Sequence, residues 1–304
     1  MRHKIYGHFF QIGHEPHKKF TEWARSLGDI YSVQMGQQNW IILTSDKVVG
    51  ELLQKRGAKY STRVPSHYTF QILARGKGYA GSPYNERYRK INPIMHSVLG
   101  QRNDEGTLDD LDVIYLTNEI FSAGTDTVSA SLTWLTAALA NNPHVQSKAH
   151  QELDRVIGQS RIPEVSDEQN IPYIRAIIKE SQRYCGPVYL GLPHAIEEDD
   201  DYNGYHIPAN SVVVLNQYGI HTDEKRYENP KEFKPERFLG FTESSATLAN
   251  GNYENRDHFG FGAGRRLCTG IHMAERELLF GVTRLLWCFK IENASPLGKD
   301  VKFE

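Results

Sequence analysis

The sequence feature that most constrains the fold is an apolar periodicity running from Leu108 to about Asn141. Apolar residues recur there at helical spacing, at Leu108, Leu111, Ile114, Phe121, Val128, Leu132, Leu135 and Leu139. This spacing predicts one α-helix, which at about 1.5 Å per residue would be roughly 50 Å long. Thr107 and Asp110 predict a capping-box start, and Pro143 follows the predicted end. Because such a helix crosses a whole domain, we expect a mainly helical fold.

The middle of this predicted helix departs from good helix-forming sequence. Gly124-Thr125-Asp126-Thr127 stands where leucine or alanine would stabilise a helix, and glycine costs about 1 kcal/mol relative to alanine. Threonine hydroxyls can also bond back to preceding carbonyl groups. Two interpretations stay open. Either Gly124 lets another helix pack closely while Asp126 faces water, or a hydroxyl and a carboxylate point into a groove.

The remaining periodic segments predict a mainly α fold with a small β portion. Strands are expected at 30–36, 39–45, 188–196 and 211–216, with a turn at Asn203-Gly204. Helices are expected at 46–55 with Ser45 as N-cap, at 84–99 around Pro93, and at 143–156, 172–184 and 270–289.

Composition excludes several function classes. A net charge of −2 and a pI near 6.7 give no overall attraction to nucleic acid. The three cysteines, Cys185, Cys268 and Cys288, include no C-x-x-C pair, which argues against a disulfide framework and a structural zinc site. No apolar run approaches the ~18 residues of a membrane span, and MRHKIYGHFF is no signal peptide. We therefore expect no membrane anchor within this chain.

The segment FGAGRRLCTG, residues 261–270, combines a cysteine, glycines and arginines. Cys268 precedes a predicted helix, whose free N–H groups and dipole favour a thiolate. Glycine permits a positive φ and a close approach of the backbone to a planar group, and the loop has Gly262, Gly264 and Gly270. Arginine pairs with carboxylates, and the loop has Arg265 and Arg266. This combination suits an axial thiolate ligand of haem iron.

Three alternative roles are open to this loop. A phosphate cradle would need a preceding strand and the P-loop lysine. A cysteine nucleophile would need a partner histidine, and the chain has 13 candidates. A structural role is the commonest fate of a cysteine, and it describes Cys185 and Cys288 well.

The loop resembles the haem-binding segment of the cytochrome P450 family. The pattern F-x-x-G-x-R-x-C-x-G is present as Phe261, Gly264, Arg266, Cys268 and Gly270. AGTDT (123–127), an E-x-x-R pair and PERF (235–238) occur in the family's order. The E-x-x-R spacing is weak by itself, since it occurs four times, at Glu22/Arg25, Glu86/Arg89, Glu152/Arg155 and Glu180/Arg183. The resemblance selects the last of these pairs.

The resemblance implies a role for each matching residue. Cys268 would be the proximal ligand of the iron of haem b (iron protoporphyrin IX), with Phe261, Gly262, Gly264 and Gly270 around it. Arg266 and His194 would contact haem propionates. Asp126 and Thr127 would help deliver protons to dioxygen, and Ala123 and Gly124 would leave room for it. Glu180, Arg183 and Arg237 would form a structural ion-pair network.

The reaction implied is insertion of one atom of dioxygen into a small hydrophobic organic substrate. Electrons would come from NADPH through an NADPH-cytochrome reductase, which would dock near Arg87, Arg89, Lys90 and Arg265. The local sequence FGAGRRLCTGIHMAERELLF resembles that of fungal members of the family that modify secondary metabolites. The resemblance also implies that the protein is located at the cytosolic face of the endoplasmic reticulum membrane.

The chain departs from the family pattern in several places. Tyr88 and Asn92 replace the tryptophan and arginine of the family's W-x-x-x-R. The helices that normally lie between the first basic helix and the long central helix are missing after Leu99-Gly100, and the final strands are missing after Glu304. We therefore expect a single incomplete P450 domain over 1–304, with an N-terminal part at 1–100 and the remainder at 101–304. The alternative to a monooxygenase is a catalytically inactive haem-binding fragment, or a chain that does not fold alone.

Overall fold

The structure, a computed structural model, describes residues 5–64, 67–97 and 108–293. The described chain is mainly helical with a small β portion, as predicted. Its contacts form two compact units. Unit 1 comprises Met1–Ala123, Tyr189–Ile220 and Phe261–Gly270, and unit 2 comprises Gly124–Val188, His221–Gly260 and Ile271–Glu304.

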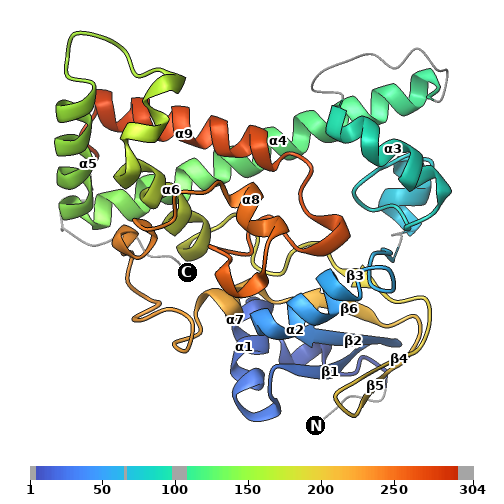
Figure 1. Cartoon of the computed structure of the whole chain (residues 1–304). Coiled ribbons are helices and arrows are strands. Elements are labelled where there is room, and N and C mark those ends of the chain that lie inside the picture. Colours follow the sequence, from blue (N-terminus) through green and yellow to red (C-terminus); the bar gives the residue numbers. More distant parts are fainter. Residues whose placement is uncertain (1–4, 65–66, 98–107, 294–304) are drawn as a thin grey trace. The chain divides into compact units, whose positions relative to one another are not determined.

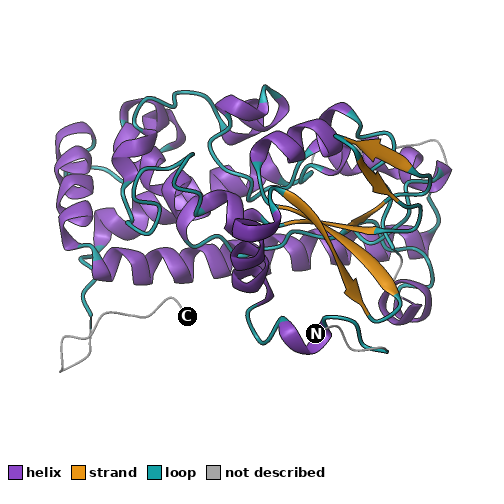
Figure 2. Cartoon of the chain, turned by 90° about the horizontal axis from the view of Figure 1, so that it is seen from below, coloured by secondary structure: helices purple, strands orange, loops and turns teal. Residues whose placement is uncertain are grey.

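Unit 1 contains a four-stranded sheet in the order β1-β2-β6-β3 (Figures 1 and 2). Its strands are β1 (Ile30–Met35), β2 (Gln38–Leu43), β6 (Val212–Leu215) and β3 (His194–Ala195). β1 and β2 form the predicted hairpin, in which Gly36 takes a φ of 61°. β6 runs parallel to β2, so a late segment of the chain lies beside the N-terminal hairpin. Phe20, from α1 (Pro16–Leu27), packs in the core of this sheet.

The predicted strand over 188–196 is wrong except at β3. Gly191 adopts a φ of 61° and Pro193 has no N–H, and both interrupt a regular strand. The predicted Asn203-Gly204 turn is confirmed, with φ values of 49° and 81°. It joins a separate antiparallel pair, β4 (Asp200–Tyr202) and β5 (Tyr205–Ile207).

The helical segments of unit 1 agree with most predicted bounds. α2 (Asp46–Val49) continues as a π-helical turn over Gly50–Lys55, and the Ser45 side chain accepts a hydrogen bond from the Val48 N–H as predicted. α3 (Glu86–Ser97) contains Pro93. Shorter helical turns lie at Phe9–Gln11, His67–Leu73 and Gly264–Arg266, and α7 spans Gln217–His221.

The long central helix, α4 (Asp110–Asn141), starts two residues later than predicted. Asp109 and Asp112 form its start, because the carboxylate of each accepts the backbone N–H of the other, at 2.7 and 3.3 Å. Thr107, the predicted cap, lies outside the described residues. α3 ends at Ser97, so at most twelve residues, 98–109, join α3 to α4.

Unit 2 packs helices around a large apolar core, beside a smaller cluster of Ala176, Tyr227 and Phe238. Its helices are the end of α4, α5 (Pro143–Val156), α6 (Pro172–Tyr184), α8 (Ser245–Asn250) and α9 (Ile271–Cys288), with 3₁₀ turns at Val165–Asn170, Pro235–Phe238 and Tyr253–Asn255. The core includes Leu135, Leu139, Leu153, Ile174, Ile177, Leu278 and Val282. Phe289, predicted on the buried face of the last helix, is exposed.

The predicted apolar face of α4 is fully buried toward its C-terminal end, whereas nearer the N-terminal end the buried apolar residue is Leu116, outside the predicted set. Leu135 and Leu139 are 1% and 0% exposed, whereas Leu111, Ile114 and Phe121 are 41%, 60% and 72% exposed. The periodicity therefore predicted the helix correctly, but not how much of it is covered.

Candidate functional site

The cysteine loop, Phe261–Gly270, lies in unit 1 and is closed by a backbone hydrogen bond from Cys268 N–H to the Phe261 carbonyl, at 2.9 Å. Gly262 and Gly264 have φ values of 78° and 66°. A Cβ on Gly264 would clash with the carbonyl oxygen of Leu53, so only glycine lets the loop approach this turn. Gly270 does not take a positive φ, which corrects that part of the expectation.

The Cys268 side chain is exposed, although protein surrounds it closely enough to change its acidity. Desolvation by this surrounding protein raises the pKa of the Cys268 thiol, and the Gly270 N–H lowers it by less. The free N–H groups after the loop therefore do not give a thiolate in the chain alone. A metal ion bound to sulfur would supply the missing stabilisation, since coordinating thiols are deprotonated.

Arg266 is buried behind the loop and is held by carbonyl groups. Its Nε donates to the Ser61 carbonyl at 2.7 Å and its Nη2 to the Ser82 carbonyl at 2.6 Å. Its guanidinium carbon lies 3.6 Å from the ring centroid of Tyr88. The tyrosine that replaces the family's tryptophan therefore keeps an aromatic surface beside this cation.

Asn92, which replaces the family's arginine, belongs to a hydrogen-bonded group with two tyrosines. Its Oδ1 accepts from the Tyr79 hydroxyl at 2.5 Å and lies 3.2 Å from the Tyr88 hydroxyl. The two tyrosine rings stack with centroids 5.0 Å apart. Where the family pattern has the positive charge of an arginine, this chain therefore has a neutral amide bonded to two tyrosine hydroxyls.

Arg63 is a candidate site residue that sequence reasoning missed. It is buried, and its Nη1 donates to the carbonyls of Leu192 and Pro193. Its buried Nε has no hydrogen-bond partner among the described residues. Burial, followed by the charge of Arg266, lowers the pKa of Arg63 to about 9. No sequence motif marked this arginine, because its nearness to Arg266 arises only on folding.

Arg63 and Arg266 form a buried cationic pair without a carboxylate partner in the part of the chain that the structure describes. Within the described ranges, neither forms an ion pair with a carboxylate. Buried charges normally have a partner of opposite sign. An anionic group with two carboxylates, such as the propionates of haem, would fit this pair.

His194 lies on β3 in the same unit and is buried. Its Nδ1 is 2.8 Å from the Tyr60 carbonyl, so Nδ1 carries the proton and Nε2 is an acceptor. Burial, and then Arg63, lowers the pKa of His194 to about 3. Neutral His194 therefore cannot donate to a propionate through Nε2 until a proton is added.

The AGTDT residues lie on α4, with Ala123 at the end of unit 1 and Gly124, Asp126 and Thr127 in unit 2. Asp126 and Thr127 are exposed. A Cβ on Gly124 would meet no atom of the described chain within 4 Å. Close packing of another helix therefore does not explain this glycine, and the space beside it is open.

Glu180, Arg183 and Arg237 lie together in unit 2. Arg183 donates to both carboxylate oxygens of Glu180, each at 2.7 Å, and Arg237 Nε lies 3.1 Å from the same carboxylate. Glu180 and Arg183 have 0% side-chain exposure. The three side chains therefore form a buried ion-pair network.

The other three E-x-x-R pairs do not form such networks. Glu22 pairs with Lys19, and Glu86 pairs with Lys90. Glu152 accepts the backbone N–H groups of Tyr173 and Ile174 at the start of α6. Burial and bidentate geometry thus distinguish the Glu180/Arg183 pair from the three other pairs, which the spacing in the sequence alone could not do.

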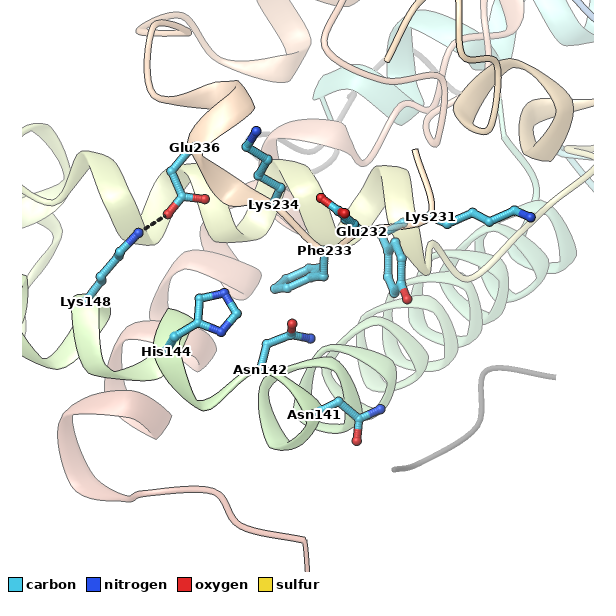
Figure 3. A pocket seen from close by; sticks show the side chains of 10 residues that line it. Asn141, Asn142, His144, Lys148, Lys231, Glu232, Phe233, Lys234 and Glu236 are labelled. Atoms are coloured by element: carbon cyan, nitrogen blue, oxygen red, sulfur yellow. Dashed lines mark hydrogen bonds and ion pairs between the residues drawn. The ribbon is translucent and has the colours of Figure 1, made fainter. Parts of the chain in front are cut away.

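A pocket of about 630 Å³ in unit 2 borders the Glu180 network, because Lys234 lines the pocket and its backbone N–H donates to Glu180. Figure 3 shows its lining, where Lys148 pairs with Glu236 at 2.6 Å and His144 lies near Phe233. None of the predicted site residues is among those that line it. Its mixed charges do not resemble the uncompensated cationic pair of unit 1.

Comparison with known proteins identifies the family. The model of the family described as "Cytochrome P450" matches residues 1–102 and 89–300. The chain belongs to the cytochrome P450 family. Proteins of this family carry haem, so the residues around Cys268 can be compared with the needs of that group.

The curated relatives are fungal cytochrome P450 monooxygenases. The atE protein of Aspergillus terreus is 43% identical over 210 residues, which cover 68% of this chain and 38% of the relative. The patI protein of Penicillium expansum is 45% identical over 186 residues, covering 61% of this chain and 35% of the relative. This P450 chain thus spans about two fifths of the length of relatives such as atE.

A more distant relative aligns along most of the chain. A P450 monooxygenase of Arthrobotrys oligospora, AOL_s00215g282, is 26% identical over 421 aligned residues, covering 92% of this chain and 78% of the relative. The alignment is longer than the 304-residue chain, so the relative has segments without a counterpart here.

Solved structures give the same fold. A zebrafish cytochrome P450 with abiraterone has a TM-score of 0.78 at 21% identity, covering 90% of this chain and 91% of that chain. A zebrafish P450 structure with progesterone has a TM-score of 0.75 at 19% identity, covering 90% of this chain and 92% of that chain. The P450 fold is therefore shown for this chain.

Proposed function

We propose that this chain is a haem-thiolate monooxygenase in which the Cys268 sulfur ligates the iron of haem b. One observation carries the proposal: the exposed thiol belongs to the same unit as Arg63 and Arg266, two buried cations without carboxylate partners among the described residues. These arginines would hold the propionates, and His194 would join them when protonated. Gly262 and Gly264 would keep the loop backbone close to the porphyrin.

The bound haem would supply the oxidising chemistry, in which one oxygen atom of O₂ enters the substrate and the other leaves as water. Two electrons would come from NADPH through a reductase. The residues of this chain would bind and position the reactants and move protons. The Asp126 carboxylate and the Thr127 hydroxyl would carry protons toward the oxygen site, while Ala123 and Gly124 would leave space for dioxygen.

The partners proposed are a small hydrophobic substrate, with a secondary metabolite favoured by the fungal relatives, and an NADPH-cytochrome reductase. Of the four basic residues expected near the reductase dock, Arg87 lies 2.7 Å from Asp112 and Lys90 lies 2.9 Å from Glu86. Arg89 and Arg265 are exposed and remain the better candidates. Replacing both with glutamate should lower reductase-driven turnover without changing haem content.

We further propose that the two units belong to one P450 domain and that the protein acts at the cytosolic face of the endoplasmic reticulum. No helix within the described ranges has both the length and the hydropathy of a membrane span.

The second candidate function is a haem-binding protein without monooxygenase activity. It is favoured by the short connection between α3 and α4 and by the exposed apolar residues Leu111, Ile114 and Phe121. If no other segment covers them, water would reach the iron, and reduced oxygen would decay instead of reacting with substrate.

A carbon monoxide difference spectrum of the reduced, haem-reconstituted protein tests the proposal. A thiolate-type band is expected for the wild type and for Cys288→Ser, a matched control because Cys288 is also an exposed free cysteine. Cys268→Ser should lose this band. An unchanged band in Cys268→Ser, or no haem uptake by the wild type, would contradict the proposal. Supplying NADPH, reductase and candidate hydrophobic substrates then separates the two functions. A monooxygenase would form an oxygenated product, whereas an inactive haem protein would pass the electrons of NADPH only to dioxygen, giving NADP⁺ and reduced oxygen species.

A further inference from the structure

Two buried histidines in unit 2 hold the backbone immediately before the cysteine loop. His221 and His258 are 5% and 1% exposed. The Phe259 N–H donates to Nε2 of His221 at 2.8 Å, and the Gly260 N–H donates to Nδ1 of His258 at 3.1 Å. The next residue in the chain, Phe261, is the first residue of the cysteine loop.

These hydrogen bonds require both imidazole rings to be neutral. A ring nitrogen that accepts an N–H carries no proton, and its neutral ring has its single proton on the other nitrogen. Protonation of either ring would point two N–H groups at each other and leave a charge in the protein interior. Each histidine can therefore hold its backbone partner only while it is uncharged.

The groups around His221 oppose its protonation. Its ring centroid is 6.4 Å from that of His258, and Arg183, Arg226 and Arg256 face it. Burial, and then these positive neighbours, places the pKa of His221 well below its ordinary value.

The groups around His258 have mixed charge, but their balance also opposes protonation. Asp257 favours a charged ring, whereas Lys179 and Arg256 disfavour it. The Asp257 carboxylate already accepts from Lys179 at 2.6 Å and from the Ser245 hydroxyl. Burial outweighs the attraction of Asp257 and lowers the pKa of His258 to about 4.

We propose that His221 and His258 are positioning residues for the cysteine loop. In their neutral forms they fix the backbone at Phe259 and Gly260, and protonation releases this segment and, with it, the bound haem. The part of this proposal that concerns haem rests on the proposed function.

The direction of the pH effect follows from the difference between closed and open states. When residues 259 and 260 are released from the histidines (the open state), the pKa of each histidine would be near its ordinary value of about 6.5. When both hydrogen bonds are formed (the closed state), the pKa of His258 is about 4. Falling pH between these values therefore favours opening. The opening constant should rise about tenfold per pH unit for each histidine, and thus up to about a hundredfold for both.

Hydrogen exchange of the full chain tests the histidines without any substitution. The protection factors of the Phe259 and Gly260 amides should fall by up to about a hundredfold per unit between pH 6.5 and pH 4.5. The buried Ile42 amide, in the middle of β2, is the control and should not show this dependence. Equal pH dependence at Ile42 and at residues 259–260 would overturn the proposal.

Haem transfer to apomyoglobin tests the link to the cofactor. His221→Gln and His258→Asn keep a neutral acceptor near Nε2 and Nδ1, respectively, but cannot be protonated. Both variants should hold haem as the wild type does at pH 7.5, and each should reduce the acid acceleration of transfer by about tenfold per pH unit. His206→Asn is the control, because His206 is an exposed histidine on β5.

The outcomes separate this proposal from the proposed function. If the wild type takes up no haem at pH 7.5, the proposed function fails, and hydrogen exchange alone judges the histidines. If haem binds but both variants lose it with the pH dependence of the wild type, the positioning role is wrong. If a variant fails to fold, the exchange data on the unmodified chain decide.

Discussion

Replacing Glu180 with glutamine should destabilise unit 2 strongly, because this carboxylate is the counter-charge of a fully buried guanidinium. Glu180 accepts two hydrogen bonds from Arg183, one from Arg237 and one from the Lys234 backbone N–H. Glutamine has nearly the same shape but only one acceptor oxygen and no charge. Arg183, with 0% side-chain exposure, would then be left without an anionic partner in this network.

The size of the effect follows from the burial of the pair. Removing one partner of a buried ion pair costs about 3–5 kcal/mol, because the remaining charge stays desolvated. Arg183 would keep hydrogen bonds to the carbonyls of His221 and Pro230, at 2.8 and 2.9 Å. We therefore expect the lower part of this range, which corresponds to more than about a hundredfold in the unfolding equilibrium.

Urea unfolding followed by circular dichroism measures this loss. Glu86→Gln is the matched control, because Glu86 has the same E-x-x-R spacing but is 75% exposed and pairs with Lys90. The control should leave the free energy of unfolding essentially unchanged, because exposed ion pairs contribute little. The reasoning would be refuted if Glu180→Gln lost less than about 1 kcal/mol, or no more than the control.

Three further predictions concern the loop, the propionate site and the β4–β5 hairpin. Gly264→Ala should abolish haem uptake by clashing with Leu53, whereas Gly270→Ala, whose Cβ would stand at an ordinary 3.9 Å from Cys268 Sγ, should retain it. Haemin binding near pH 7 should release a proton from the Cys268 thiol and take one up at His194, so calorimetry in buffers of different ionisation enthalpy should show about one proton fewer released by the wild type than by His194→Asn; equal release would exclude a charged His194 in the complex. Burial raises the pKa of Asp200, but hydrogen bonds from two cationic side chains and a tyrosine lower it to about 2, so its stabilisation should be complete above about pH 4 and lost toward pH 2. Asp200→Asn should remove about 1–2 kcal/mol at pH 7 and flatten acid unfolding, and an unchanged urea midpoint would contradict this.

The sequence predicted most elements whose ends depend on local chemistry. Pro143 and Pro172 start α5 and α6 as expected, and Ser45 caps α2, because each effect acts within one turn of the chain. The region before β3 was predicted as a strand because apolar residues dominate it. The positive φ of Gly191 and the missing N–H of Pro193 decide otherwise.

The candidate site was predictable only where a motif marks it. The loop around Cys268 and the Glu180 pair were found through their spacing and order. Arg63 was missed because its importance depends on Arg266, which lies about two hundred residues later in the chain. The burial that keeps His194 neutral and the Tyr60 carbonyl that accepts its Nδ1–H were hidden for the same reason, since Tyr60 is remote in sequence.

The unpaired guanidinium groups of Arg63 and Arg266 also affect how this P450 chain matures. Two buried like charges repel each other, and no carboxylate of the described chain offsets this repulsion. If the proposed haem binds there, its two carboxylates would relieve this repulsion, and cofactor insertion would be a late step of folding. Cells short of haem should therefore accumulate a looser, protease-sensitive form, and simple polyanions should partly rescue it.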